Sequence, residues 1–278
     1  MGISDFIKKL SYRDSVRRAA RSLHLAAVLR KAYYVWARPR HGVLRIEVAG
    51  ISARFHVRTP SELRVLDPAG AAQGEQQILE FFISSLRSGD VFYDIGANIG
   101  LYTVILAKVV GAGGQVMAFE PGSEASEHLR DNIQANTLPN VRCFQQALGD
   151  RKGQERFYRG QGNADSSLMR PPTGVYMGHE MVDVVEGDRL VESENLPLPN
   201  AVKVDVEGYE YAVLRGLSHT LRQPCCRMIS CEVHPCLLPS HVKLDDVLTL
   251  LRSLDFSRIE IRQRRDTFHA LCYKEPPN

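Results

Sequence analysis

A chain of 278 residues with 44% hydrophobic and 24% charged side chains has the composition of a globular protein with one large domain and an appendage. The net charge of +3 is unevenly spread, because eleven Lys or Arg and two Asp give residues 1–45 a charge of +9 and leave −6 on the rest. No apolar run reaches the ~18 residues that cross a bilayer, and the N-terminus lacks the apolar core of a signal peptide, so we expect a cytoplasmic protein.

Residues 1–42 predict a basic helical arm. Apolar residues fall loosely on one face of 3–37 with basic residues between them, and Pro39 ends the helix. Such a charge run is usually a solvated face, but residues 1–40 could also dock on an anionic membrane surface or pack on the body. A position peripheral to the membrane therefore stays open beside the cytoplasmic expectation.

The next segment, 43–70, predicts a β-hairpin and a linker, because polar and apolar residues alternate around Gly50. From residue 71 to residue 278 strands alternate with helices, which is typical of an α/β domain with parallel strands. The expected elements are a helix at 75–86, strand 91–94, helix 101–110, strand 115–120, helix 123–136, strand 141–148, an insertion at 150–187 with two β-like pieces, strand 201–206, helix 209–216, strand 228–233, helix 244–254, and strands 258–262 and 269–273.

Polar or turn residues follow five consecutive strands of this domain. Open parallel sheets bind ligands at the carboxyl ends of their strands, so these positions predict one shared crevice. In chain order they are Asp94 with a glycine turn, Glu120, Gln146 with Ala147, Asp205 with Glu207, and Glu232 with His234.

The glycine turn reads Asp94-Ile-Gly96-Ala97-Asn98-Ile-Gly100. No Lys follows Gly100 as a phosphate-binding loop requires, and glycines four apart do not fit the dinucleotide fingerprint. An acid at position 94 would repel a pyrophosphate, but it complements the sulfonium and ammonium of S-adenosylmethionine (SAM). The turn therefore favours SAM, with the glycines letting the backbone approach it.

Glu120 ends the second strand, where a carboxylate can accept hydrogen bonds from the ribose hydroxyls of a nucleoside. The alternative is a solvated acid at a strand end. Adenine would lie at the third strand end, where Gln146, Ala147 or Asp150 could contact it; the spacing does not choose among them.

Six runs of the chain stand out in this domain: "YDIGANIGLYTVILA", "AFEP", "QALGD", "NADSSL", "VKVDVEGYEYAVLRG" and "CEVHP". Together they resemble the FkbM family of class I SAM-dependent methyltransferases, over roughly residues 71–275. The resemblance implies a Rossmann-like, mostly parallel sheet with an antiparallel last strand, SAM as cofactor, and O-methylation of a sugar or natural product. It maps Asp94, Gly96, Asn98 and Gly100 onto the SAM loop and Glu120 onto the ribose acid, and it does not fix the substrate.

Four residues at the fourth and fifth strand ends are the catalytic candidates: Asp205, Glu207, Glu232 and His234. An alcohol is a weak nucleophile, and a base beside it contributes ~10²–10⁴-fold. His234 could take the proton with Glu232 orienting it, or both could be structural hydrogen-bonding groups at a sheet edge. These groups could also hold a divalent metal, but no ligand spacing indicates one, so no metal is predicted.

The sequence indicates only the chemical class of the molecule that receives the methyl group. Asn163, Asp165, Ser166 and Ser167 of the insertion could line an acceptor pocket or be turn residues. We expect a small-molecule or glycan hydroxyl; an amine, a protein or a nucleic acid is the alternative. The run after Asp205 differs from the Pro-Pro run common in base methylation, and the body is acidic, so nucleic acid is disfavoured. An intact glycine turn with Glu120 argues against a non-catalytic module.

Overall fold

In a computed structural model the described residues are 42–59, 62–63, 66, 73–160, 166–170, 177–264 and 266–275. Apart from residue 42, the basic arm expected at 1–42 and its membrane contact lie outside them, as do Asn163 and Asp165. Within the described ranges, no helix has both the length and the apolar character needed to cross a membrane.

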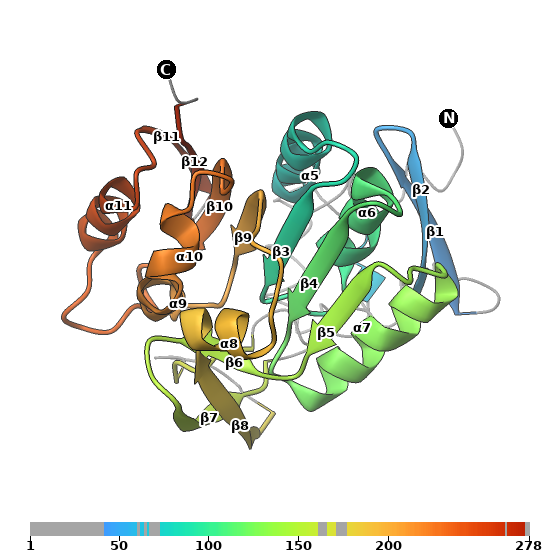
Figure 1. Cartoon of the computed structure of the whole chain (residues 1–278). Coiled ribbons are helices and arrows are strands. Elements are labelled where there is room, and N and C mark those ends of the chain that lie inside the picture. The colour runs from blue at the N-terminus through green and yellow to red at the C-terminus, as the bar shows by residue number, and fades with distance from the viewer. Residues whose placement is uncertain are drawn as a thin grey trace, which may run out of the picture.

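A seven-stranded sheet forms the centre of the fold, in the order β11-β12-β10-β9-β3-β4-β5 (Figure 1). The five strands from β10 to β5 run parallel, and β12 is antiparallel to both of its neighbours, β10 and β11. The expected Rossmann-like α/β sheet with an antiparallel last strand is thus confirmed. The strands are β3 (Val91–Ile95), β4 (Gln115–Phe119), β5 (Val141–Phe144), β9 (Ala201–Val204), β10 (Met228–Val233), β11 (Arg258–Arg264) and β12 (Thr267–Tyr273).

Successive strand residues point to opposite sides of the sheet, and helices cover both sides, so both faces of the sheet are buried. In β3, Phe92 joins a core with α5 and α6, whereas Tyr93 and Ile95 join a second core with the helices on the other face. Figure 1 shows α9, α10 and α11 on one side of the sheet, away from α5, α6 and α7. The helices are α5 (Gln73–Ser85), α6 (Leu101–Val110), α7 (Ser123–Ala135), α8 (Gly187–Ser193), α9 (Glu210–Gly216), α10 (Ser218–Arg222) and α11 (Leu244–Ser253).

The expected hairpin is confirmed as β1 (Val43–Val48) and β2 (Ile51–His56), which pair antiparallel and lie beside α7 in Figure 1. Its residue Phe55 is fully buried in the core that contains α5 and α6. The backbone N–H groups of Arg54 and His56 donate to the side-chain amides of Asn136 (3.0 Å) and Asn132 (2.8 Å). These bonds satisfy the outer edge of β2, which would otherwise present unpaired donors.

The expected single strand 141–148 is wrong. The chain leaves the sheet after β5, and β6 (Ala147–Gly149) joins β8 (His179–Glu186) and β7 (Gly153–Tyr158) in a separate three-stranded sheet. A Cβ on Gly216, at the end of α9, would lie 1.7 Å from the Gly149 carbonyl oxygen. Glycine at 216 lets β6 approach the end of α9 backbone to backbone, and Gly149 packs against Tyr209 and Val184, so β6 lies beside α9 and β8 instead of continuing β5.

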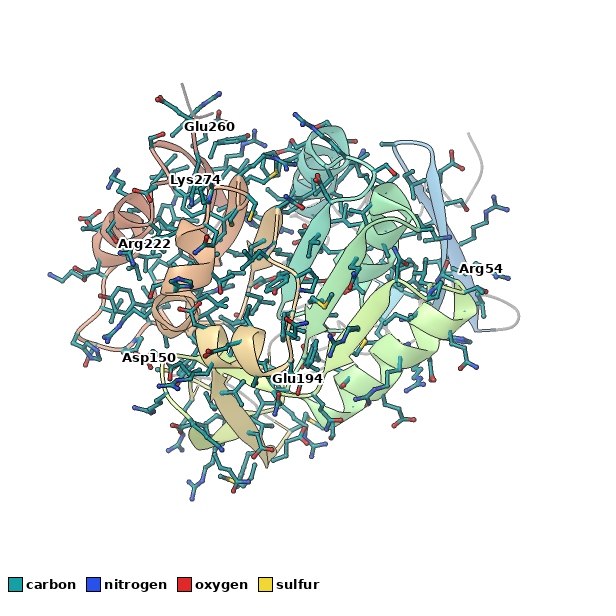
Figure 2. The ribbon with its side chains drawn as sticks, viewed as in Figure 1. Arg54, Asp150, Glu194, Arg222, Glu260 and Lys274 are labelled. Carbon is teal, nitrogen blue, oxygen red and sulfur yellow. The ribbon has the colours of Figure 1, made fainter. Side chains whose placement is uncertain are left out.

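Charged side chains cover the outside of the molecule, and Figure 2 shows Arg54 and Arg222 at its periphery. A smaller set of charged groups is buried instead, among them Asp94, Glu120, Lys203, Glu210 and His234. Burying a charge is costly unless it is paired or hydrogen-bonded. These buried groups therefore mark the part of the fold where function is to be sought.

Candidate functional site

A cavity of about 550 Å³ opens at the carboxyl ends of β3, β4, β9 and β10. This volume is typical of a small-molecule site. Asp94 and Gly100 are not among the lining residues. The other ten of the twelve residues predicted from the sequence line it: Gly96, Ala97, Asn98, Glu120, Gln146, Ala147, Asp205, Glu207, Glu232 and His234.

The glycine turn is held between two strands. The backbone N–H groups of Gly96 and Ala97 both donate to the Phe119 carbonyl at the end of β4, at 3.0 and 3.1 Å. Gly96 has a φ of 80°, and a Cβ there would lie 1.8 Å from the Asp205 carbonyl oxygen. Glycine is therefore required at 96 by the close approach of the turn to β9, before any ligand is considered.

Gly100 lies where the glycine turn enters α6. It has a φ of 91° as the N-cap of α6, and a Cβ there would lie 2.5 Å from the Leu129 side chain of α7. Its conformation starts α6, and its small size lets α7 pack closely. Gly100 therefore sets the conformation of the turn without lining the cavity itself.

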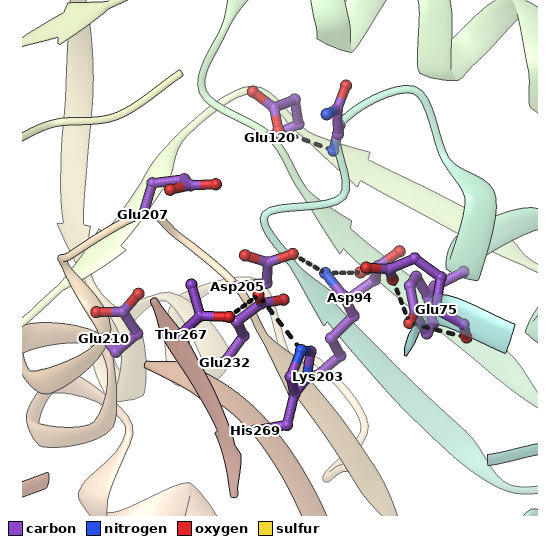
Figure 3. Close-up of polar contacts among 12 residues, drawn as sticks. Glu75, Asp94, Glu120, Lys203, Asp205, Glu207, Glu210, Glu232, Thr267 and His269 are labelled. Atoms are coloured by element: carbon purple, nitrogen blue, oxygen red, sulfur yellow. Dashed lines mark hydrogen bonds and ion pairs between the residues drawn. The ribbon is translucent and has the colours of Figure 1, made fainter. Parts of the chain in front are cut away.

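Asp94 lies beneath the turn, fully buried on β3. Its Oδ2 accepts a hydrogen bond from Thr103 Oγ1 at 2.6 Å, and Lys203 Nζ is 4.0 Å from its Oδ1. Burial raises the pKa of Asp94, although Lys203 and Thr103 act in the opposite direction. In this structure Lys203 complements the charge of Asp94, and Figure 3 shows the lysine between Asp94 and Asp205.

Glu120 is almost buried, at 5% exposure, and its carboxylate is held by the backbone. One oxygen accepts the N–H of Asn98 at 2.9 Å, and the other accepts the N–H of Gly122 at 2.9 Å (Figure 3 shows the first bond). Burial raises the pKa of Glu120 to about 7, because it outweighs the two amide hydrogen bonds. A carboxylate has about four acceptor positions, so each oxygen keeps capacity for one more donor.

The adenine candidates at the third strand end divide in two. Gln146 and Ala147 line the cavity, at the place where the chain leaves β5 for β6. Asp150 is not among the lining residues; its carboxylate lies 3.5 Å from Arg215 Nε of α9. The structure therefore favours Gln146 and Ala147 over Asp150 as residues beside a ligand.

Asp205 and Glu207 follow the end of β9, and the strand geometry does not continue to them. Lys203 Nζ lies 3.1 Å from Asp205 Oδ2. Glu207 has a φ of 52°, in the left-handed region that non-glycine residues adopt rarely, and its carbonyl accepts a hydrogen bond from buried Ser167. This backbone turn brings the Glu207 side chain to the cavity, and Ser166 lines the same cavity.

His234 lies at the end of β10 between carboxylates. Its Nδ1 is 2.7 Å from Glu210 Oε1, and its Nε2 is 3.3 Å from Glu207 Oε2. Burial alone would lower the pKa of His234, but the bond to Glu210 and the charges of Glu207 and Asp205 raise it to about 10. At neutral pH the side chain is therefore an imidazolium, hydrogen-bonded to Glu210 and ion-paired with Glu207.

Glu232 has partners of its own. Thr267 Oγ1 donates to Glu232 Oε1 at 3.0 Å, and His269 Nε2 lies 3.3 Å from the same oxygen. Burial would raise the pKa of Glu232, but His269 and His234 hold it below its ordinary value. The expected orienting partner of His234 is thus replaced: Glu210, not Glu232, makes the short contact.

Asp205, Glu207 and His234 form a group with metal-ligand chemistry. One ligand atom from each lies within 4.8 Å of the others. The sequence did not predict a metal because the ligands come from different elements and no local spacing joins them. Such a group could hold a divalent ion, although the lysine beside Asp205 already supplies a positive charge there.

Four further residues of the site were missed from the sequence: Lys203, Glu210, Glu75 and Arg264. Arg264 Nη1 lies 2.7 Å from Glu75 Oε1, and Tyr102 O–H donates to Glu75 Oε2 at 2.6 Å, so this group joins α5 to β11 at the cavity wall. Lys203 alone carried a signal, since a lysine within the apolar run of a central strand needs a buried partner.

The comparisons agree with this geometry. The methyltransferase FkbM domain family matches residues 94–258, more than half of the chain. The hexuronic acid methyltransferase AglP of Haloferax volcanii is 28% identical over 239 residues, which cover 83% of this chain and 90% of that protein. The 31-O-demethyl-FK506 methyltransferase FkbM of Streptomyces tacrolimicus is 27% identical over 201 residues, covering 62% and 74%.

Among solved structures, a SAM-dependent O-methyltransferase from Thermotoga maritima aligns with a TM-score of 0.47 and 13% identity, covering 84% of this chain and 78% of that one. The order and direction of the strands establish the fold without this alignment. Together with the family match, the cavity at the strand ends leads to one conclusion: the chain belongs to the FkbM methyltransferase family and is a methyltransferase that uses SAM.

Proposed function

We propose that this methyltransferase transfers the methyl group to a hydroxyl of a sugar, a glycan or a natural-product-like small molecule. The observation that carries the proposal is one cavity that joins the glycine turn and Glu120 to the carboxylate of Asp205. The names of two relatives support it, since one acts on hexuronic acid and the other on 31-O-demethyl-FK506.

The lining near β3 and β4 fits SAM. Glu120 presents a nearly buried carboxylate with acceptor capacity left on both oxygens, which suits two ribose hydroxyls. Ala97 and Asn98 would lie along the cofactor, and Gln146 and Ala147 beside its adenine. When bound, SAM supplies an electrophilic methyl group on a sulfonium sulfur.

Asp205 is our choice for the base. It lies at the end of β9, lines the cavity, and would accept the hydroxyl proton as the acceptor oxygen attacks. Lys203, 3.1 Å away, holds its carboxylate in place from behind. His234 is less suited to that role, because its raised pKa keeps it protonated. We assign it instead to hold Glu207 on the acceptor side, with Glu210 fixing its ring.

The proposal is tested by methyl transfer from labelled SAM to a panel of hydroxyl compounds and their O-methylated counterparts. A hydroxyl acceptor should gain label, and the counterpart already methylated at that oxygen should not. Mass spectrometry of the product identifies the oxygen. Transfer to nitrogen of amines or proteins, with none to any hydroxyl, would show that the acceptor class is wrong while the methyltransferase assignment stands.

A further inference from the structure

The cavity carries an excess of negative charge among its described residues. Two cationic side chains, Lys203 and Arg264, stand against six carboxylates, which leaves a formal charge of −4. Protonated His234 reduces this to −3. The six carboxylates are Glu75, Glu120, Asp205, Glu207, Glu232 and Asp266.

The cofactor does not neutralise this excess. SAM carries a sulfonium, an ammonium and a carboxylate, a net charge of +1, so its binding leaves about −2 within the cavity when Glu120 is ionised and about −1 when it is protonated. A cavity lined by one sign of charge attracts ligands of the opposite sign and repels those of the same sign. An acceptor with a carboxylate therefore meets repulsion here, and one with a positive charge is stabilised. In this respect the acceptor would differ from the hexuronic acid in the name of one relative, with which it would share the hydroxyls of a sugar.

The placement of the acids tells where that positive charge would lie. One carboxylate oxygen of Asp205, one of Glu207 and one ring nitrogen of His234 all lie within 4.8 Å of one another. A hydroxyl directed at Asp205 therefore has a second carboxylate, Glu207, within reach of the neighbouring substituent. Glu232 and Asp266 line the same cavity.

We infer that the acceptor carries an ammonium group next to the hydroxyl that is methylated, as in an amino sugar or another amino alcohol. A protonated amine has no free electron pair to attack the methyl group, so the ammonium binds while the hydroxyl reacts. The inference rests on the proposed O-methylation and deepens it by naming the acceptor class.

Binding tests it without turnover. The full-length protein, loaded with S-adenosylhomocysteine, is titrated with the methyl glycosides of glucosamine, glucose and glucuronic acid, followed by ligand-observed NMR. The glucosamine glycoside should bind about 10-fold more tightly than the glucose glycoside, and the glucuronide more weakly than both. Added salt should reduce these differences, because it screens charges at the partly open cavity.

Variants locate the effect. Asp266→Lys reverses an exposed charge of the lining and should lower the glucosamine-to-glucuronide affinity ratio by about 10-fold. Glu232→Gln should lower it as well, with the shape of the side chain kept. Glu47→Lys, on the exposed face of the hairpin outside the cavity lining, makes the same charge change as the first variant and should leave the ratio unchanged.

Equal binding of the three glycosides overturns the inference, as does binding of N-acetylglucosamine glycoside as tight as that of the amine, or failure of the amine to bind. Tighter binding of the glucuronide with added magnesium or manganese also overturns it, in favour of a metal at Asp205, Glu207 and His234. Methyl transfer is read separately. If the amine binds preferentially but gains no label, the O-methylation proposal is wrong and the binding inference stands. If a hydroxyl gains label with no preference for the amine, the binding inference is wrong and the O-methylation proposal stands.

Discussion

The two halves of the cavity, to which we assign the cofactor and the acceptor in our proposal, are built differently. Around β3 and β4, the cofactor half is made of backbone: a glycine turn bonded to the Phe119 carbonyl, and a Glu120 carboxylate held by two backbone N–H groups. Around β9 and β10, the acceptor half is made of paired side chains, in which Lys203 meets Asp205 and His234 meets Glu210 and Glu207.

This difference predicts how the two halves respond to substitution. The glycine turn depends on close approaches between backbone atoms, and side-chain rotation cannot make room for a larger residue there. A set of charged side chains can be exchanged residue by residue with the sheet intact. We therefore expect substitutions in the cofactor half to damage folding or SAM affinity, and those in the acceptor half to damage rate and acceptor choice.

The largest effect is expected for Asp205→Asn, which sharpens the contrast. Loss of the base should lower the rate of methyl transfer by at least ~10²-fold. SAM affinity, measured by calorimetry, should stay within a few-fold because the cofactor half is unchanged. Asp183→Asn, at an exposed position of β8, is the matched control and should transfer methyl at the normal rate. An Asp205→Asn enzyme with full activity would remove Asp205 from the role of base.

In the cofactor half, Gly96→Ala should act on stability. Its methyl group would lie 1.8 Å from the Asp205 carbonyl oxygen, at a φ of 80° that alanine adopts rarely. We expect a loss of about 3 kcal/mol or more in the free energy of unfolding by urea. Gly153→Ala has open space around its Cβ and should stay near wild type. Similar unfolding of the two variants would contradict the tight backbone contact.

A third test separates affinity from rate. Glu120→Ala should weaken SAM binding by about 10–100-fold and change the rate at saturating SAM far less, because the ribose contacts act in the ground and transition states alike. With a folded pKa of about 7, the carboxylate gains its charge between pH 6 and 8, so wild-type SAM affinity should rise by up to about 10-fold over that interval. Glu120→Gln should remove the rise. A flat wild-type profile would argue against an ionising ribose acceptor.

The smallest effect concerns His234. Its folded pKa of about 10 exceeds the ordinary value of 6.5, so its stabilising contribution is complete below about pH 6.5 and is lost as pH rises through about 10. The free energy of unfolding should fall by about 2 kcal/mol between pH 7 and 9. In His234→Gln that part of the slope should vanish, whereas His241→Gln, at an exposed position, should keep it. Equal slopes in the two variants would place the imidazolium outside this carboxylate group.

The sequence by itself determined the succession of strands and helices along the chain and most of the residues at the strand ends. Alternation, turn chemistry and motifs such as the glycine turn act over a few neighbouring residues, so helix 101–110 and strand 228–233 are confirmed to the residue. The same local information placed ten of twelve predicted site residues at one cavity. It erred at 141–148, where β6 pairs with β8 and lies against Gly216, because these contacts join segments far apart in the chain that local alternation does not reveal.

Only the tertiary structure decided which charges meet. Asp94 faces Lys203 because β3 and β9 pair in parallel register, although 108 residues of chain lie between them. His234 meets Glu210 because the start of α9 returns beside β10, and Glu232 is left to His269 on β12. Such pairs depend on register and burial, which the whole core sets, and the pKa values that decide between base and imidazolium depend on them in turn.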